Sequence, residues 1–118
     1  AYNHINENLF YYASRGFTRT GEIKPELAAP GVNILGTLPG NLFGVNSGTS
    51  IAAAYVAGIA ALIFESQRNY GAEHVLSTVE IKHLLIRGAN RSAQRNYPSR
   101  DWGYGTVDVY RSFERLRE

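Results

Sequence analysis

A short polar stretch, Ser47-Gly48-Thr49-Ser50, stands directly before a long apolar run in this sequence of 118 residues. The run, residues 51–64, is rich in alanine and is predicted to form a helix, so that Ser50 falls in its first turn. The first turn of a helix carries unpaired backbone N–H groups and the positive end of the helix dipole. A serine hydroxyl there could act as a nucleophile, because the N–H of Ser50 would stabilise a neighbouring oxyanion. Gly48 would leave room for a substrate carbonyl.

Other loops that precede a helix fit this stretch less well. A phosphate-binding P-loop requires a lysine before its final Ser or Thr, and residues 44–50 contain none. The nucleophile elbow of α/β-hydrolases requires glycine two residues before and two after the serine, whereas Ala52 follows here. For these four residues alone, the simplest interpretation is that Thr49 or Ser50 caps the helix.

The elements that must position this stretch can be predicted from local pattern. The aromatic run Leu9–Ala13 and the segment Val32–Leu35 are predicted to be strands, and residues 38–41 to form a turn. Residues 44–50 are predicted to form a loop. The helix over residues 51–64 has no polar face, which is typical of a helix surrounded by protein.

The second half of the chain predicts two more helices. Ser77 and Glu80 have the spacing of a capping box, apolar residues follow at helical spacing, and Gly88 is a stop signal. Residues 90–104 form a long polar loop, and Asp108 is predicted to cap a last helix.

Composition excludes several classes of function. The absence of cysteine excludes a disulfide scaffold, a thiolate zinc site and a cysteine nucleophile, and we predict no metal site and no cofactor. Twelve basic residues face ten acidic ones, and the seven arginines from Arg87 onward are spaced singly among acidic residues and tyrosines. This spacing favours solvated or paired side chains over a nucleic-acid surface. The apolar run is shorter than the ~20 residues of a membrane span, so none is predicted.

Four stretches, in order, resemble the subtilisin-like serine peptidases, or subtilases. Residues 10–16 resemble the strand and Ser-x-Gly turn of these enzymes, and residues 24–31 their Lys-Pro-Asp-x-x-Ala-Pro-Gly signature. Residues 47–58 resemble the nucleophile motif Gly-Thr-Ser-x-Ala-x-Pro-His-Val-Ala-Gly, and residues 102–109 the closing Gly-x-Gly segment. The resemblance implies that Ser50 is the nucleophile and that its N–H, with Thr49 near it, contributes to the oxyanion hole.

The sequence also departs from the family pattern. Ala54 and Tyr55 replace the usual Pro-His, Glu26 replaces an aspartate, and Phe17 replaces a common proline, which affects subgroup and substrate and not the nucleophile. Residues 85–89 and 97–105 resemble the clostridial spore-germination type of subtilase.

The partners of a serine nucleophile are missing from the expected places. Subtilases supply them in the chain order Asp, His, Ser. Only His4 precedes Ser50, and no aspartate does, while His74 and His83 follow it. The oxyanion-hole asparagine of the family, in an Ala-x-Gly-Asn-x-Gly segment, has no counterpart here either.

The resemblance therefore implies that residues 1–118 are the C-terminal segment of a subtilase catalytic domain. The implied fold class is α/β, part of a three-layer fold with a mostly parallel sheet. The chain is expected to be inactive alone, and its partners would be the N-terminal remainder of the same domain and a peptide or protein substrate. The family implies a secreted, cell-surface or spore-associated protein. Two alternatives stay open: a non-catalytic pseudoprotease acting in binding or signalling, and a domain that binds acidic partners through its arginine-rich tail.

Overall fold

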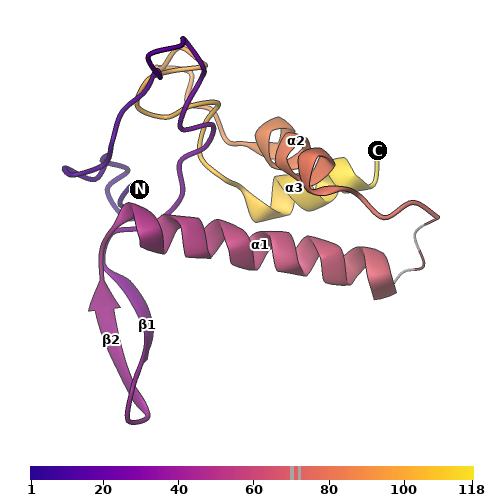
Figure 1. Cartoon of the computed structure of the whole chain (residues 1–118), viewed down its shortest axis with the longest axis horizontal. Coiled ribbons are helices and arrows are strands. Elements are labelled where there is room, and N and C mark those ends of the chain that lie inside the picture. The colour runs from indigo at the N-terminus through magenta and orange to yellow at the C-terminus, as the bar shows by residue number, and fades with distance from the viewer. Residues whose placement is uncertain (70, 72) are drawn as a thin grey trace.

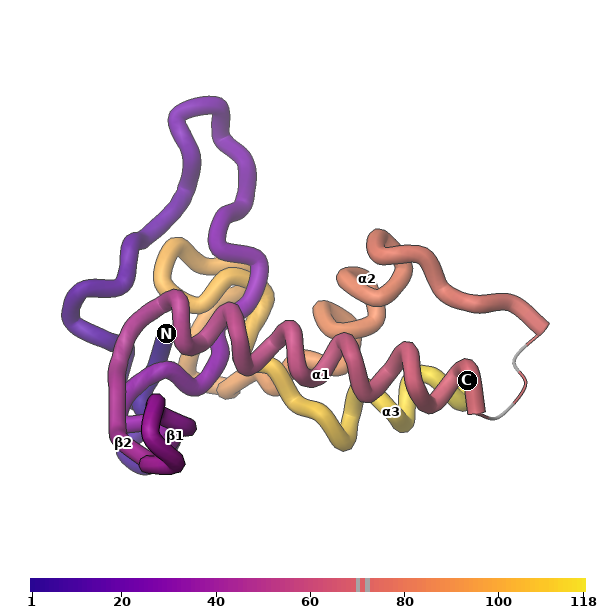
Figure 2. Tube along the Cα trace, turned by 60° about the horizontal axis from the view of Figure 1, so that its bottom comes forward, coloured from indigo at the N-terminus to yellow at the C-terminus, as the bar shows by residue number. Residues whose placement is uncertain are grey.

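The computed structural model describes residues 1–69, 71 and 73–118. One hairpin and three helices follow one another along the chain: β1 (Ile34–Leu38), β2 (Leu42–Asn46), α1 (Thr49–Asn69), α2 (Thr78–Gly88) and α3 (Val109–Leu116). The hairpin projects from the end of the molecule where α1 begins, and α2 and α3 lie side by side along the other end of α1 (Figures 1 and 2). The irregular loops of residues 1–31 and 90–107 lie together above the start of α1 (Figure 1).

The hairpin differs from the sequence prediction. The turn predicted at residues 38–41 is present, but the first strand begins at Ile34, and residues 44–46, predicted as loop, belong to β2 (Leu42–Asn46). The two strands are antiparallel, with Leu38 opposite Leu42 and Gly36 opposite Gly44. Gly44 was one reason to predict a loop, but it is a residue of β2. The side chain of Leu38 lies over it, with its Cδ1 2.5 Å from where a Cβ of residue 44 would be.

The strand predicted at Leu9–Ala13 is wrong, because this segment forms a turn in which the N–H of Ala13 donates to the carbonyl of Phe10 at 3.0 Å. Its aromatic rings pack on one another instead of pairing with a sheet. Phe10 and Tyr12 are 5.8 Å apart between ring centroids, and Tyr11 and Tyr12 are 5.0 Å apart, both edge to face.

The expected parallel sheet is present only as isolated pairings. Within the described residues, the one regular sheet is the antiparallel hairpin. Parallel bridges join Tyr2 to Pro30 and Ala28 to Thr106. Three distant segments therefore run in the same direction side by side, with residues 28–30 in the middle. This arrangement carries the Ala-Pro-Gly segment directly to the start of α1.

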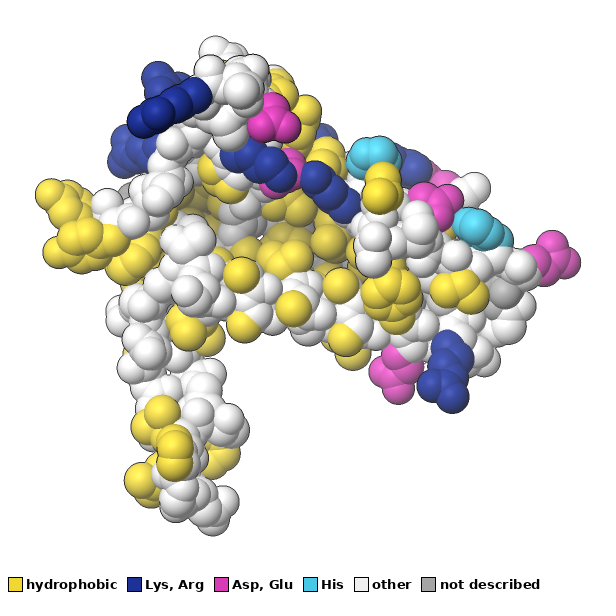
Figure 3. All heavy atoms as spheres, in the orientation of Figure 1, with side chains coloured by type: hydrophobic (Ala, Val, Ile, Leu, Met, Phe, Trp, Pro, Cys, Tyr) yellow, Lys and Arg dark blue, Asp and Glu magenta, His cyan; other side chains and the backbone are white. Residues whose placement is uncertain are grey.

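Helix α1 is longer than predicted and less covered. Its buried residues lie on one stripe, Ala52, Ile59, Ile63 and Gln67, whereas Tyr55, Leu62 and Phe64 are exposed. Apolar side chains accordingly show along α1 and between it and the loops above (Figure 3). By length and composition alone α1 could cross a membrane, a criterion that core helices of soluble proteins also meet. The expectation that protein surrounds α1 is not met within the described residues.

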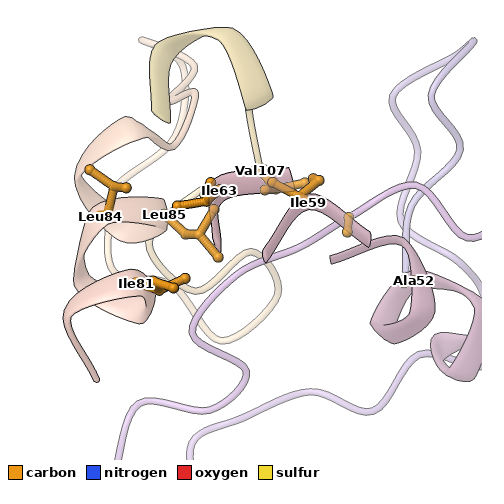
Figure 4. Close-up of a cluster of buried hydrophobic side chains, with 8 residues drawn as sticks. Ala52, Ile59, Ile63, Ile81, Leu84, Leu85 and Val107 are labelled. Atoms are coloured by element: carbon orange, nitrogen blue, oxygen red, sulfur yellow. The ribbon is translucent and has the colours of Figure 1, made fainter. Parts of the chain in front are cut away.

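The core joins α1 to the pair α2 and α3. Ile59 and Ile63 of α1 pack against the apolar face of α2 and Val107 (Figure 4). Both predicted helix caps are confirmed: Ser77 and Glu80 form the reciprocal capping box, and the Asp108 carboxylate accepts from the N–H of Arg111 at 2.9 Å. At Gly88 a Cβ would lie 2.8 Å from the Ser112 backbone, so glycine permits α2 and α3 to meet.

Candidate active site

Thr49 and Ser50 are the first two residues of α1, and both are exposed. In the part of the chain that the structure describes, the Ser50 hydroxyl has no hydrogen-bond partner. The simplest sequence interpretation, a cap by Thr49 or Ser50, is therefore wrong, because neither side chain bonds a helical N–H.

The backbone of Gly48 occupies the cap position instead. Its carbonyl accepts from the N–H groups of Ile51 at 3.1 Å and Ala52 at 3.2 Å. Among residues 1–69, 71 and 73–118, the N–H groups of Thr49 and Ser50 have no acceptor. Two free donors and the positive end of a 21-residue helix thus lie beside the Ser50 hydroxyl, an arrangement suited to stabilising a negatively charged oxygen.

Gly31 holds the start of α1 against the parallel segments. Its carbonyl accepts from the N–H of Gly48 at 2.7 Å. A Cβ on Gly31 would lie 2.6 Å from the Ala1 Cβ, 2.7 Å from the Gly48 carbonyl oxygen and 3.0 Å from the Ala52 Cβ. Only glycine allows this approach, so Gly31 positions the loop that precedes α1.

Ser47 fixes the other side of the loop. Its hydroxyl accepts from the N–H of Asn33 at 2.8 Å, and its own N–H donates to the Asn46 side chain at 2.8 Å. Asn33 has a φ of 53°, a left-handed conformation that asparagine tolerates. The positioning roles of Gly31, Asn33 and Ser47 were not predicted from the sequence. The Ala-Pro-Gly motif, which ends at Gly31, was the feature that could have indicated them.

A cavity of about 410 Å³ adjoins the first turns of α1. Thr49 lines it, Ser50 does not, and most of its surface is apolar. The apolar lining residues come from α1 and from the loops that face it: Leu9, Ala13, Leu27, Ala28, Ala29, Ala52, Ala53 and Val56. Asp101 also lines the cavity and is 3.4 Å from Arg15. The volume falls within the range of ligand sites.

The described residues do not assemble a Ser-His-Asp triad. His74 lies 3.2 Å from Glu80 and shares a second cavity with Ser66, about 24 Å along α1 from Ser50 at the rise of a helix. His83 belongs to α2, and no hydrogen bond joins His4 to Ser50. Within the described chain no group of three His, Cys, Asp or Glu residues could hold a metal ion.

Glu26, in the segment that leads to Gly31, ties this segment to α2. Its carboxylate forms ion pairs with Lys24 and with Lys82 of α2. Partial burial raises the pKa of Glu26, but the hydrogen bonds from the two lysines outweigh it and lower the pKa from 4.5 to about 2. A depressed pKa means that the carboxylate stabilises the folded state above pH 4.5 and that this contribution disappears as the pH falls toward 2.

We expect Glu26→Gln to remove this acid-sensitive contribution. The wild type should lose about 1 kcal/mol more stability than the variant between pH 4.5 and about 2, since the pairs are partly exposed. Urea unfolding of the intact protein over this pH range measures the difference. Glu65→Gln, an exposed change on α1, should keep the wild-type pH dependence; an equal loss in all three proteins would contradict the role of Glu26.

Comparison with known proteins decides the family. The family model described as the Subtilase family matches residues 1–105. This chain belongs to the subtilase family. The resemblance in the four sequence motifs is thereby confirmed.

Several subtilases of known sequence or structure are similar to this chain. C5a peptidase of Streptococcus pyogenes is 41% identical over 86% of the chain, and pyrolysin of Pyrococcus furiosus is 32% identical over 97%. The solved structure of the Clostridium perfringens CspB protease superposes on the whole chain with a TM-score of 0.92 at 42% identity. The chain spans 9% and 8% of the two sequences and 25% of the solved structure. It therefore has the fold of one portion of a subtilase.

Proposed function

We propose that this chain is the nucleophile-bearing segment of a subtilisin-like serine endopeptidase and that Ser50 is the nucleophile. The observation that carries the proposal is the Ser50 hydroxyl, exposed in the first turn of α1 and without a hydrogen-bond partner among the described residues. It stands in a Gly-Thr-Ser motif beside two free N–H donors. Nucleophilic catalysis by serine needs an accessible hydroxyl and donors for the oxyanion, and both are in place.

The reaction follows from these groups. Ser50 Oγ attacks the carbonyl carbon of the scissile peptide while a histidine from outside this chain takes the hydroxyl proton. The resulting oxyanion accepts a hydrogen bond from the N–H of Ser50. When the C–N bond breaks, the histidine protonates the leaving amine and an acyl-enzyme remains on Ser50. Water then hydrolyses the ester and restores the hydroxyl.

The remainder of the catalytic domain would supply the histidine and the aspartate. Its contact surface would be the apolar cavity beside the first turns of α1 and the exposed face of that helix, where Tyr55, Leu62 and Phe64 are 42%, 51% and 38% exposed. So much exposed apolar surface on one helix is typical of a surface that protein covers. The substrate would be a peptide or protein, the substrate class of the family.

We expect the isolated chain to be unreactive toward a fluorophosphonate probe, which labels activated serines, and the intact protein to be labelled. The reason is that no described histidine bonds Ser50, so its hydroxyl keeps its proton. In-gel fluorescence of the two proteins at equal concentration measures the difference, and heat-denatured intact protein is the control for nonspecific labelling. Labelling of the isolated chain would show that the activating base lies within residues 1–118. An intact protein that is folded but unlabelled would favour a pseudoprotease.

A further inference from the structure

A hollow of about 430 Å³ is lined by residues of α2, of α3 and of the segments that follow these helices, and none of its lining residues belongs to the loop before α1. Four arginines line it, Arg87, Arg91, Arg111 and Arg115, and we call it the arginine hollow. Two carboxylates, Glu114 and Glu118, also line it, so its lining carries a net positive charge. The surface is largely polar, unlike the cavity beside Ser50.

Arg91 is held by hydrogen bonds to backbone carbonyls, which orient its guanidinium and do not neutralise its charge. Its Nε donates to the carbonyl of Tyr104 at 2.7 Å, and one Nη donates to the carbonyl of Ile86 at 2.9 Å. The bond to Ile86 satisfies a carbonyl in the last turn of α2. No carboxylate of the described residues lies within ion-pair distance of Arg91. A guanidinium has five N–H donors, so two bonds to backbone carbonyls orient Arg91 and leave three N–H groups and the full charge for a ligand in the hollow.

Arg115 forms an ion pair with the carboxylate of Glu118 in the same chain. One of its Nη atoms donates to both carboxylate oxygens of Glu118, at 2.8 Å each, and Arg87 lies 3.7 Å from the same carboxylate. The hydrogen bond from Arg115 and the charge of Arg87 hold the pKa of Glu118 below its usual value. The contacts with Glu118 thus show that these two arginines can bind a carboxylate group.

Arg111, a residue of α3, also lines the hollow. It donates to the Asn90 side chain at 3.4 Å and lies 3.7 Å from the Asp108 carboxylate. These contacts are long, so an anion with better geometry can compete for the guanidinium. Arginine side chains bind phosphate and carboxylate groups through paired hydrogen bonds, and several in one hollow favour a ligand with more than one anionic group.

We propose that the arginine hollow binds a small polyanion with at least two phosphate or carboxylate groups, one of which displaces Glu118 from Arg115. The volume fits a small ligand and not a folded partner. This site is separate from the proposed nucleophile and would be a ligand-binding function in addition to peptidase activity.

Calorimetric titration of the intact protein with pyrophosphate and, separately, with citrate tests the proposal at constant ionic strength. We expect saturable binding of at least one of the two, which would also identify phosphate or carboxylate as the preferred group. The double change Arg87→Gln and Arg115→Gln should weaken binding roughly tenfold or more, because charge-assisted hydrogen bonds are lost. Both side chains are about half exposed, so the fold should be unaffected, as circular dichroism can verify.

Glu118→Gln should have the opposite effect on the affinity for the anion. Removing the internal competitor and its negative charge should strengthen binding roughly 2 to 5 times, as expected for one surface ion pair. Arg19→Gln, an exposed arginine outside the hollow, is the matched control and should bind as the wild type does. Ser50→Ala should also bind normally, which separates this site from the proposed function. Absence of saturable binding of both ligands, or binding that the double change leaves intact, would overturn the proposal.

Discussion

Ser50→Ala in the intact protein should abolish peptide-bond cleavage while the protein stays folded. The expected loss in kcat is about 10⁶-fold, the value known for the family member subtilisin and carried over to this chain. The loss is this large because every covalent step proceeds through Ser50 Oγ, and the other members of a triad contribute little without the nucleophile. Hydrolysis of a chromogenic peptide and fluorophosphonate labelling measure it independently.

Two other serines provide comparison variants, one expected to be neutral and one expected to have an intermediate effect. Ser66→Ala, on the same helix, should keep wild-type activity. Ser47→Ala should lower activity by roughly tenfold, because it removes the acceptor of the Asn33 N–H and loosens the loop that carries Ser50. The affinity of Ser50→Ala for a peptide inhibitor, measured by direct binding, should change little, since the hydroxyl is exposed and its loss leaves the surrounding surface intact. A Ser50→Ala variant with substantial residual cleavage would assign the nucleophile to another residue.

The helices were predictable because their signals are local. Ser77 and Glu80 cap α2 through a four-residue pattern, and Asp108 caps α3 through one side chain, so neither depends on distant contacts. The family was also evident from the sequence and is confirmed.

The strands were not predictable because their pairing is not local. Residues 42–46 became β2 since they lie opposite residues 34–38, a partnership that glycine content alone obscures. The aromatic run at residues 9–13 has strand propensity but forms a turn, and no strand of the described residues pairs with Tyr11 or Tyr12, which are largely exposed. The parallel bridges of residues 28–30 join segments that are far apart in sequence.

The sequence motif proposes the residues of the candidate site, but it does not predict the contacts that support them. Ser50 and Gly48 follow from the motif, whereas the contact of Gly31 with the start of α1 requires knowing which segments meet. The apolar pattern of α1 predicted burial on all sides, but the described chain covers one stripe of it. Periodicity reports where apolar side chains are, and not which part of a protein covers them.

Gly31→Ala should disable the enzyme without touching Ser50, and this is the second largest effect we expect. The added methyl group would lie 2.7 Å from the Gly48 carbonyl oxygen and 2.6 Å from the Ala1 Cβ. Real carbon contacts are not this short, so the loop or the parallel segment must move. The Gly48 N–H bond to the Gly31 carbonyl, 2.7 Å long, transmits the movement to the first turn of α1.

The displacement should reduce kcat/KM about 100-fold, since a shift of about 1 Å at a nucleophile costs this much. Overpacking should also lower stability by about 1–3 kcal/mol. Gly36→Ala, in β1 where no atom lies within 4 Å of an added Cβ, is the matched control and should change neither quantity appreciably. Peptidase assays with thermal unfolding separate the two effects, because activity measured well below the unfolding temperature reports position alone.

The rate of fluorophosphonate labelling distinguishes displacement from a loss of substrate binding. If Gly31→Ala moves Ser50 relative to its base and its oxyanion donors, labelling should slow by the same factor as kcat/KM, because the probe needs little of the substrate-binding surface. A variant that cleaves peptides slowly but labels at the wild-type rate would contradict this mechanism. The Ala-Pro-Gly motif would then serve substrate binding, and the close contact between Gly31 and Gly48 would matter for folding alone.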